Sequence, residues 1–321
     1  MDLINKIICG DSLNILKTLP DTGIDCVVTS PPYWALRQYA TNPVIWNDGW
    51  QGELGLEPDF NMYIKHLCDI FDEVKRVLKG TGTCWVNLGD TYGGSCLGLS
   101  YAKQTKGKNS ILPNDLSYMP KIAHSRGKFD KSLLLIPFRF ALEMINRGWI
   151  MRNVIIWQKP NAMPHSVKDR FTVDFEYLFF FVKSKKYYFS QQFEPITEST
   201  LQRAKSRVHE NKSKFYQGMT KEKYENFQKR ILYDPDYKGR NKRTVWNIST
   251  HPFKGVHFAI YPPKLIETPI KAGCPEEGIV LDPFMGSGTT GLVAKKLNRN
   301  WLGIELNPDY AKMAEERINA A

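Results

Sequence analysis

A serine, two prolines and a tyrosine follow a short apolar run, and their types suit the binding of a flat nitrogen base. Ser30-Pro31-Pro32-Tyr33 comes directly after the apolar run Ile24–Thr29, whose last four residues, Cys26–Thr29, read as a strand. Two adjacent prolines end such a strand in a stiff extended turn. The turn displays a hydroxyl, backbone carbonyls and an aromatic ring, which can accept hydrogen bonds from an exocyclic amine and stack on its ring. Taken alone, the tetrapeptide fits an ordinary strand-end turn equally well.

A second candidate site lies near the other end of the chain, where a glycine turn separates a strand from a helix. Residues 278–290 read as a buried strand followed by Gly286-Ser287-Gly288, and a helix then continues to about Leu297. Glycines let the backbone approach a ligand closely, and the helix N-terminus directs N–H groups towards it. A second strand, Trp301–Ile304, ends in Glu305, which can accept hydrogen bonds from ribose hydroxyls. Together these features favour a nucleotide-like cofactor over an ordinary strand–helix–strand unit.

Strand and helix patterns alternate around these motifs. Strands are expected at Lys6–Cys9, Cys26–Thr29, Thr83–Leu88, Trp149–Trp157 and Phe175–Val182, and helices at Ser12–Leu19, Asp59–Leu78 and Leu134–Asn146. Asp11 or Ser12 is expected to cap the first helix, and Gly80 and Gly82 to close the second. The alternation predicts an α/β fold, a doubly wound and mainly parallel sheet with helices on both faces.

In such a sheet, ligands bind at the carboxyl ends of the strands. Asp11, Ser30, Asp282 and Glu305 all stand at expected strand ends, so one crevice can hold cofactor and target base together. This arrangement requires the strand before Asp11 to lie beside the strand that ends in Glu305.

Composition restricts the class of protein. The chain has 321 residues, 42% of them hydrophobic, and a net charge of +11, which fits a globular protein with a polyanionic partner. The six cysteines form no C-x-x-C pair, so a zinc site or disulfide framework is not expected, and a reducing cytoplasm fits. The longest apolar run, Tyr177–Val182, is too short for a membrane span, and the first residues lack a signal-peptide layout. We therefore expect a cytoplasmic protein without metal or membrane segment.

Two stretches interrupt the alternation. Residues 93–131 are rich in Gly, Ser, Lys and Asn, and are expected to form a flexible basic loop that either closes over DNA or has no role. Residues 190–244 mix aromatic and basic side chains, and residues 183–244 hold 16 Lys and Arg against 7 Asp and Glu, a net of +9. This insert is either a recognition module or a helical cap whose aromatics form its own core. Its candidate DNA contacts are Arg203, Lys205, Arg207, Arg240, Lys242 and Arg243.

The two motifs, in this order, resemble the permuted (beta-class) DNA amino-methyltransferases that use S-adenosylmethionine. Asp282-Pro283-Phe284-Met285-Gly286-Ser287-Gly288 is similar to the cofactor loop of that family, and Ser30-Pro31-Pro32-Tyr33 to its catalytic loop. The resemblance implies a seven-stranded Rossmann-like sheet with one antiparallel strand near its edge. It also implies a catalytic domain of residues 1–189 and 245–321, with a target-recognition region inserted at 190–244.

The resemblance also implies roles for individual residues. Asp11 would contact the adenine ring, Asp282 the amino group of the cofactor and Glu305 its ribose, while the segment with Phe258 and Ala259 would cover the methionine part. The remaining cofactor residues would be Phe284, Gly286, Ser287, Gly288 and Asn307, although Asn307 also suits the turn that starts the last helix. In the catalytic loop, the Ser30 hydroxyl and Pro31 carbonyl would accept the amine hydrogens, and Tyr33 would stack on a flipped base. Lys159 would contact a phosphate.

The resemblance implies double-stranded DNA as partner, and the serine-first form of the motif implies N4 of cytosine as the methylated atom, with N6 of adenine as the alternative. Both bases present an amine beside a ring nitrogen, so Ser30 alone does not choose between them. Cytosine-C5 chemistry is not expected, because its thiolate lies in a Pro-Cys turn and this chain has Cys274-Pro275. An RNA or protein-glutamine methyltransferase and a catalytically silent DNA-binding protein stay open as alternatives. A cognate restriction endonuclease is a candidate partner, and both a monomer and a homodimer are open.

Overall fold

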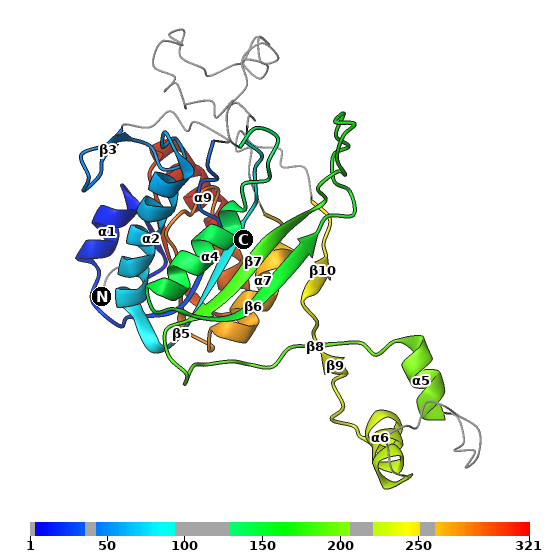
Figure 1. Cartoon of the computed structure of the whole chain (residues 1–321). Coiled ribbons are helices and arrows are strands. Elements are labelled where there is room, and N and C mark those ends of the chain that lie inside the picture. The colour runs from blue at the N-terminus through cyan, green and yellow to red at the C-terminus, as the bar shows by residue number, and fades with distance from the viewer. Residues whose placement is uncertain (1–3, 36–42, 94–128, 206–220, 251–260) are drawn as a thin grey trace. The chain divides into compact units, whose positions relative to one another are not determined.

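The computed structural model describes residues 4–35, 43–93, 129–205, 221–250 and 261–321. The chain divides into two compact units, the first made of Met1–Ser190 with Thr244–Ala321 and the second of Gln191–Arg243 (Figure 1). Among the described residues, no helix has both the length and the hydropathy that a membrane span requires.

An eight-stranded sheet forms the centre of the first unit. Its order is β1 (Lys6–Cys9), β12 (Asn300–Glu305), β11 (Ile279–Asp282), β2 (Ile24–Thr29), β5 (Leu78–Leu88), β7 (Phe175–Val182), β6 (Ile150–Gln158) and β10 (Val245–Asn247). Neighbouring strands are parallel except at β7, which runs antiparallel to both β5 and β6. The predicted doubly wound α/β fold is confirmed, and the short β10 adds an eighth strand to the seven that were expected.

The first and last strands of the chain lie side by side. β1 pairs in parallel with β12, and Cys9 stands opposite Glu305. The Gly10 N–H continues this ladder by donating to the Glu305 carbonyl over 2.9 Å. The predicted adjacency of the strand before Asp11 and the strand ending in Glu305 is therefore confirmed.

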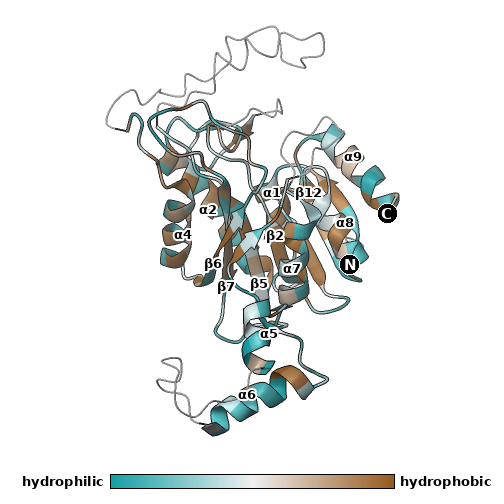
Figure 2. Ribbon diagram, turned by 90° about the vertical axis from the view of Figure 1, so that its right-hand side faces the viewer, coloured by the Kyte–Doolittle hydropathy of each residue, from teal (hydrophilic) through white to brown (hydrophobic). Residues whose placement is uncertain are grey.

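Helices cover both faces of the sheet (Figure 2). One buried core joins the sheet to α1 (Ser12–Thr18), α2 (Phe60–Val77) and α4 (Ile136–Asn146), and a second joins it to α7 (Pro263–Gly273), α8 (Thr289–Lys296) and α9 (Pro308–Asn319). Successive strand residues point to opposite faces. Val27 and Phe179 accordingly belong to the first core, and Val28 and Phe180 to the second.

The helix ends follow the expected capping chemistry at one site and depart from it at another. Asp11 is the N-cap of α1 and accepts a hydrogen bond from the Asn14 N–H over 2.9 Å. α2 ends at Val77, and β5 begins at Leu78, so the prediction that Gly80 and Gly82 close this helix is wrong. Both glycines lie in β5. A Cβ on Gly82 would stand 2.6 Å from the Leu78 side chain, so close packing within the strand requires glycine there.

The second unit has a small core of its own. It contains β8 (Phe193–Glu194) paired antiparallel with β9 (Arg240–Asn241), and two helices, α5 (Glu198–Lys205) and α6 (Lys221–Tyr233). Tyr224 is buried, packs on Phe227, and donates its hydroxyl hydrogen to the Arg203 carbonyl over 2.6 Å. Part of the aromatic content of this segment therefore packs inside the unit, as expected for a recognition module or a cap.

Candidate active site

Polar side chains from four strands meet at one edge of the sheet. Ser30 follows β2, Asn87 lies near the end of β5, Lys159 follows β6, and Glu176 is the second residue of β7. Because β7 is antiparallel to its neighbours, its first residues reach the edge where β5 and β6 end. Residues 30–33, the predicted catalytic loop, therefore face groups that lie far away in the sequence.

The Tyr33 hydroxyl lies at the centre of these groups. It is 2.7 Å from Glu176 Oε2 and 3.1 Å from Asn87 Oδ1, and the Ser30 hydroxyl donates to it over 3.4 Å. Burial, followed by the charge of Glu176, raises the pKa of Tyr33 well above its usual value. The phenol thus stays protonated, and its single hydrogen is available to the Glu176 carboxylate.

The catalytic loop is also held through its backbone and its ring. The Tyr63 hydroxyl from α2 donates to the Pro32 carbonyl over 2.8 Å. Gly89 packs so closely on the ring of Tyr33 that a Cβ there would stand 2.7 Å from Cε2. The described part of the chain supplies no hydrogen bond to the Pro31 carbonyl, the acceptor that was predicted for a target amine.

Lys159 pairs with Glu176 and was not predicted to do so. Its ammonium group forms an ion pair with Glu176 Oε1 and lies 4.5 Å from the centre of the Trp157 ring. Asn87 Nδ2 donates to Glu176 Oε2 over 3.1 Å, so this carboxylate receives hydrogen bonds from three side chains. The structure places Lys159 beside the catalytic loop, whereas its predicted phosphate contact stays a prediction.

A buried histidine of α2, His66, is linked to the same loop through Glu57 and Gly55. His66 Nδ1 is 3.0 Å from Glu57 Oε1, and His66 Nε2 is 2.9 Å from Asp48 Oδ2. Glu57 Oε2 accepts the Gly55 N–H over 2.8 Å, and the Gly55 carbonyl accepts the Ala35 N–H over 2.8 Å. Through Glu57 and Gly55, His66 is thus connected to the backbone of Ala35, two residues after Tyr33.

The side chains around His66 determine the charge of its imidazole. Burial on its own would lower the pKa of His66, but the hydrogen bonds to Glu57 and Asp48 outweigh it and hold that pKa above its usual value. The same contact with His66 lowers the pKa of Asp48 to about 2. Trp46, from the segment between β3 (Val44–Ile45) and β4 (Gln51–Gly52), stacks on the imidazole with ring centres 4.1 Å apart.

The glycine turn after β11 has the backbone that its sequence predicts. Gly286 has φ 53° and Gly288 has φ 79°, both in the left-handed region that favours glycine. A Cβ on Gly288 would stand 2.8 Å from the Ala314 Cβ, so α9 packs directly against this turn. Arg317 of α9 donates to the Ser287 carbonyl and hydroxyl, over 3.0 Å and 3.1 Å.

Glu305 connects the glycine turn to the end of β12. Its Oε2 accepts the Gly286 N–H over 2.7 Å, and its Oε1 accepts the Asn307 N–H over 2.9 Å. Asn307 is the N-cap of α9, so it forms the turn that starts this helix, and a contact with adenine stays a prediction. Burial raises the pKa of Glu305 and also that of Asp11. Each oxygen of Glu305 retains a further lone pair for a ribose hydroxyl.

Asp282 is occupied by hydrogen bonds inside the protein. Its Oδ1 accepts the Thr29 hydroxyl over 2.6 Å and the Phe284 N–H over 3.0 Å, and its Oδ2 accepts from Tyr261 over 3.1 Å and from Thr290. Only 1% of Asp282 is exposed, and burial raises the pKa of its carboxyl group. This side chain joins β11 to β2 one residue before Ser30, and its predicted contact with the cofactor stays a prediction.

The edge formed by β1, β12 and β11 fits a nucleoside cofactor. It combines a glycine turn, the half-buried Phe284 and two acids, Asp11 and Glu305, that follow or end neighbouring strands. Phe258 and Ala259, predicted to cover the cofactor, lie outside the described residues. No group of three or more His, Cys, Asp or Glu suited to a metal ion occurs in the described ranges.

The predicted DNA contacts of the second unit differ in their surroundings. Arg240 and Arg243 both pair with Glu194, over 2.8 Å and 2.7 Å. Arg203 and Lys205 are exposed on α5, Lys242 is half-buried, and Arg207 lies outside the described residues.

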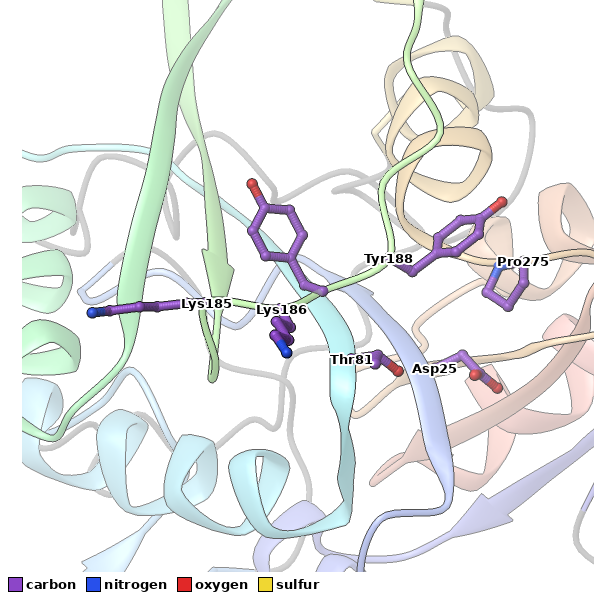
Figure 3. A pocket seen from close by; sticks show the side chains of 7 residues that line it. Asp25, Thr81, Lys185, Lys186, Tyr188 and Pro275 are labelled. Carbon is purple, nitrogen blue, oxygen red and sulfur yellow. The ribbon is translucent and has the colours of Figure 1, made fainter.

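A cavity of about 480 Å³ lies at the opposite end of the strands (Figure 3). Asp25 and Thr81 line it near the starts of β2 and β5, together with Lys185, Lys186 and Pro275. It is therefore separate from the edge that holds Ser30 and Glu305.

Sequence comparisons identify relatives along almost the whole chain. Residues 24–316 match the family N6_N4_Mtase, described as DNA methylase. The chain is 40% identical to the Type II methyltransferase M.SmaI of Serratia marcescens, over 98% of this chain and 90% of that protein. It is 39% identical to the Type II methyltransferase M.XycI of Xanthomonas campestris pv. cyanopsidis, over 96% of this chain and 86% of that protein.

Solved structures share the fold. The PvuII DNA methyltransferase, described as cytosine-N4-specific, superposes with a TM-score of 0.60 at 19% identity, covering 98% of this chain and 89% of that one. A putative DNA modification methylase of Thermus thermophilus, solved with S-adenosyl-L-methionine, gives a TM-score of 0.57 at 20% identity, covering 98% and 93%. The match across residues 24–316 and the 40% identity to M.SmaI show that this chain belongs to the DNA methylase family.

Proposed function

We propose that this chain is a permuted, site-specific DNA methyltransferase that transfers a methyl group from S-adenosylmethionine to N4 of a flipped cytosine. The observation that carries this proposal is the position of the catalytic loop. Ser30 and Tyr33 lie at the same sheet edge as the glycine turn, and the Thr29–Asp282 hydrogen bond of 2.6 Å joins the two segments. A base held at the loop and a cofactor held at the turn would thus be neighbours.

The bound cofactor supplies a methyl group on a sulfonium, which is an electrophile for an amine. The exocyclic amine is a poor nucleophile because its lone pair is delocalised into the ring. The Ser30 hydroxyl oxygen and the Pro31 carbonyl would accept hydrogen bonds from its two N–H groups and orient its lone pair towards the methyl group. As the N–C bond forms, the bond between sulfur and methyl would break and leave S-adenosylhomocysteine, and the methylated amine would lose one proton to solvent. The hydrogen bond of Tyr33 to Glu176 and the close packing of its ring on Gly89 fix the ring for stacking before any base arrives. Orientation of this kind supplies a large part of a rate enhancement without a covalent nucleophile.

The remaining assignments rest on the same proposal. Glu305, Asp11 and the glycine turn hold the nucleoside part of the cofactor, and residues 191–243 form the target-recognition region. Arg203 and Lys205, exposed on α5, are its first candidates for phosphate contacts. The Type II names of the relatives support a restriction–modification role, for which a cognate endonuclease would be the partner. A cytoplasmic location rests on the cysteine content alone.

Nucleoside mass spectrometry tests the reaction. Plasmid DNA incubated with the purified chain and S-adenosylmethionine is expected to contain N4-methylcytosine. N6-methyladenine would preserve the cofactor and the mechanism but refute the choice of base. The absence of any modified base, despite calorimetric binding of the cofactor, would refute DNA methylation and direct the search to RNA.

Substitution of Tyr33 tests the site itself. We expect Tyr33→Ala to reduce kcat strongly and to leave the affinity for S-adenosylmethionine nearly unchanged, because the ring contacts Gly89 and Glu176 and not the glycine turn. Equal losses of turnover and of cofactor affinity would instead place Tyr33 in the cofactor pocket.

A further inference from the structure

The connection between β6 and β7, residues 159–174, exposes large apolar side chains. Phe171 is 96% exposed and Met163 is 82% exposed. In Figure 1 this connection, here called the β6–β7 hairpin, extends beyond the end of β6. A single exposed apolar residue is ordinary, but a fully exposed phenylalanine beside other exposed apolar groups marks a contact surface.

The exposure of Phe171 does not reflect a detached segment, because the hairpin is fixed at several points. At its base, the Lys159 N–H donates to the Asp174 carbonyl over 2.7 Å. Near its tip, Asp169 pairs with Lys131 over 2.8 Å, and the Arg170 guanidinium lies 3.4 Å from the centre of the Tyr92 ring. Phe171 thus follows two anchored residues and still points its ring into solvent.

The base of the hairpin is part of the candidate active site. Lys159 is its first residue, and Glu176, two residues beyond its end, binds both Lys159 and the Tyr33 hydroxyl. The hairpin that carries Phe171 is therefore linked through these contacts to the loop that is proposed to hold a flipped base. The exposed Lys168, three residues before Phe171, adds a positive charge to the hairpin, which suits a polyanion.

We propose that the β6–β7 hairpin is a wedge that enters duplex DNA and occupies the space left by the flipped base, with Phe171 as the stacking residue and Met163 as a second exposed apolar side chain of the same hairpin. The proposal rests on the function proposed above. A flipped base leaves its neighbours unstacked, and proteins that deform DNA insert apolar side chains such as Phe and Met between base steps. A phenylalanine ring there restores stacking that the base has lost, and any neighbouring base offers it a surface.

The test compares Phe171→Ala with the wild-type chain on two short duplexes that carry the site mapped on plasmid DNA. In one duplex the target base is paired, and in the other it stands opposite an abasic site, so flipping is already easy. On paired DNA we expect kcat/KM to fall roughly 5- to 150-fold, the range that corresponds to the loss of one base–aromatic stack. On the abasic duplex most of this loss should disappear, and Phe171→Trp should retain activity on both.

Leu142→Ala provides the matched control, since Leu142 is 62% exposed on α4 and has no role in the proposal. Equal losses on both duplexes, or no loss on paired DNA, would overturn the wedge. A change of molecular mass in light scattering with normal kinetics would assign Phe171 to contacts between copies and would also overturn it. If the wild-type chain modifies no DNA, the proposed function fails, whereas an active wild type with an unaffected Phe171→Ala refutes the wedge alone.

Discussion

Removal of the His66 imidazole should destabilise the first unit strongly and more at low pH than at high pH. His66 lies fully buried between two carboxylates, 3.0 Å from Glu57 and 2.9 Å from Asp48. Glu57 is itself 0% exposed. In His66→Gln the carboxylate of Glu57 loses its cationic partner and keeps backbone N–H donors, among them that of Gly55 at 2.8 Å.

The magnitude follows from the burial of this pair. Removing one member of a buried, hydrogen-bonded ion pair costs about 3–5 kcal/mol, because the other charge remains away from water. An equilibrium free energy of unfolding of about 5–15 kcal/mol would lose a large fraction of its value. Since Glu57 also positions Gly55 and Ala35, we expect turnover to fall along with stability.

The dependence on pH follows from the raised pKa of His66. A histidine whose pKa is higher in the folded state contributes its full stabilisation below its ordinary pKa of about 6.5 and loses it as pH rises through the higher folded value. The wild-type advantage over His66→Gln should therefore be largest near pH 6 and shrink as pH rises through the raised folded-state pKa. Asp48, the second carboxylate at His66, also pairs with Lys65, and Lys65 pairs in turn with Asp69.

Urea unfolding of both proteins across this pH range is the assay. Lys65→Ala is a matched control, because Lys65 also pairs with Asp48, over 3.4 Å, but is 49% exposed, and its loss should change stability little. Equal stability of His66→Gln and the wild type near pH 6, or a difference that grows as pH rises, would refute this account of the histidine.

Three further outcomes are expected. Glu176→Gln should lower kcat and leave cofactor affinity intact, because it weakens the hydrogen bond that restrains Tyr33. Initial-rate methylation assays measure kcat, and calorimetry measures cofactor affinity. Gly288→Ala should abolish cofactor binding and cost more than about 1 kcal/mol in urea unfolding, since φ is 79° and α9 blocks a Cβ. Thr29→Val should cost about 1–3 kcal/mol by leaving buried Asp282 short of a donor, whereas Thr29→Ser should cost less.

Much of the fold was predictable because local patterns and topology agreed. Phe175–Val182 forms the predicted strand, and the pairing of β1 with β12 follows from the order of the two motifs. The end of α2 was not predicted correctly, because glycine stops a helix in one context and permits close packing within a strand in another. Only the three-dimensional neighbours decide between these uses.

The positions of the candidate loops were predictable, and their side-chain partners were not. Residues at the carboxyl ends of parallel strands were expected at one edge of the sheet, and Ser30 and Glu305 lie there, while their roles stay predictions. Glu176 was missed because it stands at the beginning of a strand, and only the antiparallel direction of β7 brings it to that edge. One antiparallel strand was expected near the edge of the sheet, and recognition of residues 175–182 as that strand would have placed Glu176 at the ligand edge. Asp282 is the opposite case. It was predicted as a cofactor contact because it ends a parallel strand, yet it accepts hydrogen bonds from Thr29 and Tyr261 inside the protein.

The place of β11 in the sheet has a consequence for synthesis on the ribosome. β11 lies between β12 and β2, yet its residues, Ile279–Asp282, are translated after the catalytic loop, the second unit and every other strand of the sheet except β12. Before β11 has been translated, the hydrogen bond between Thr29 and Asp282 cannot form, and the edge of β2 that pairs with β11 stays unpaired. Late pairing of distant segments is slow and leaves strand edges exposed. A nascent chain stalled before residue 279 should therefore bind neither cofactor nor base productively, so modification activity would appear only after β11 has been translated.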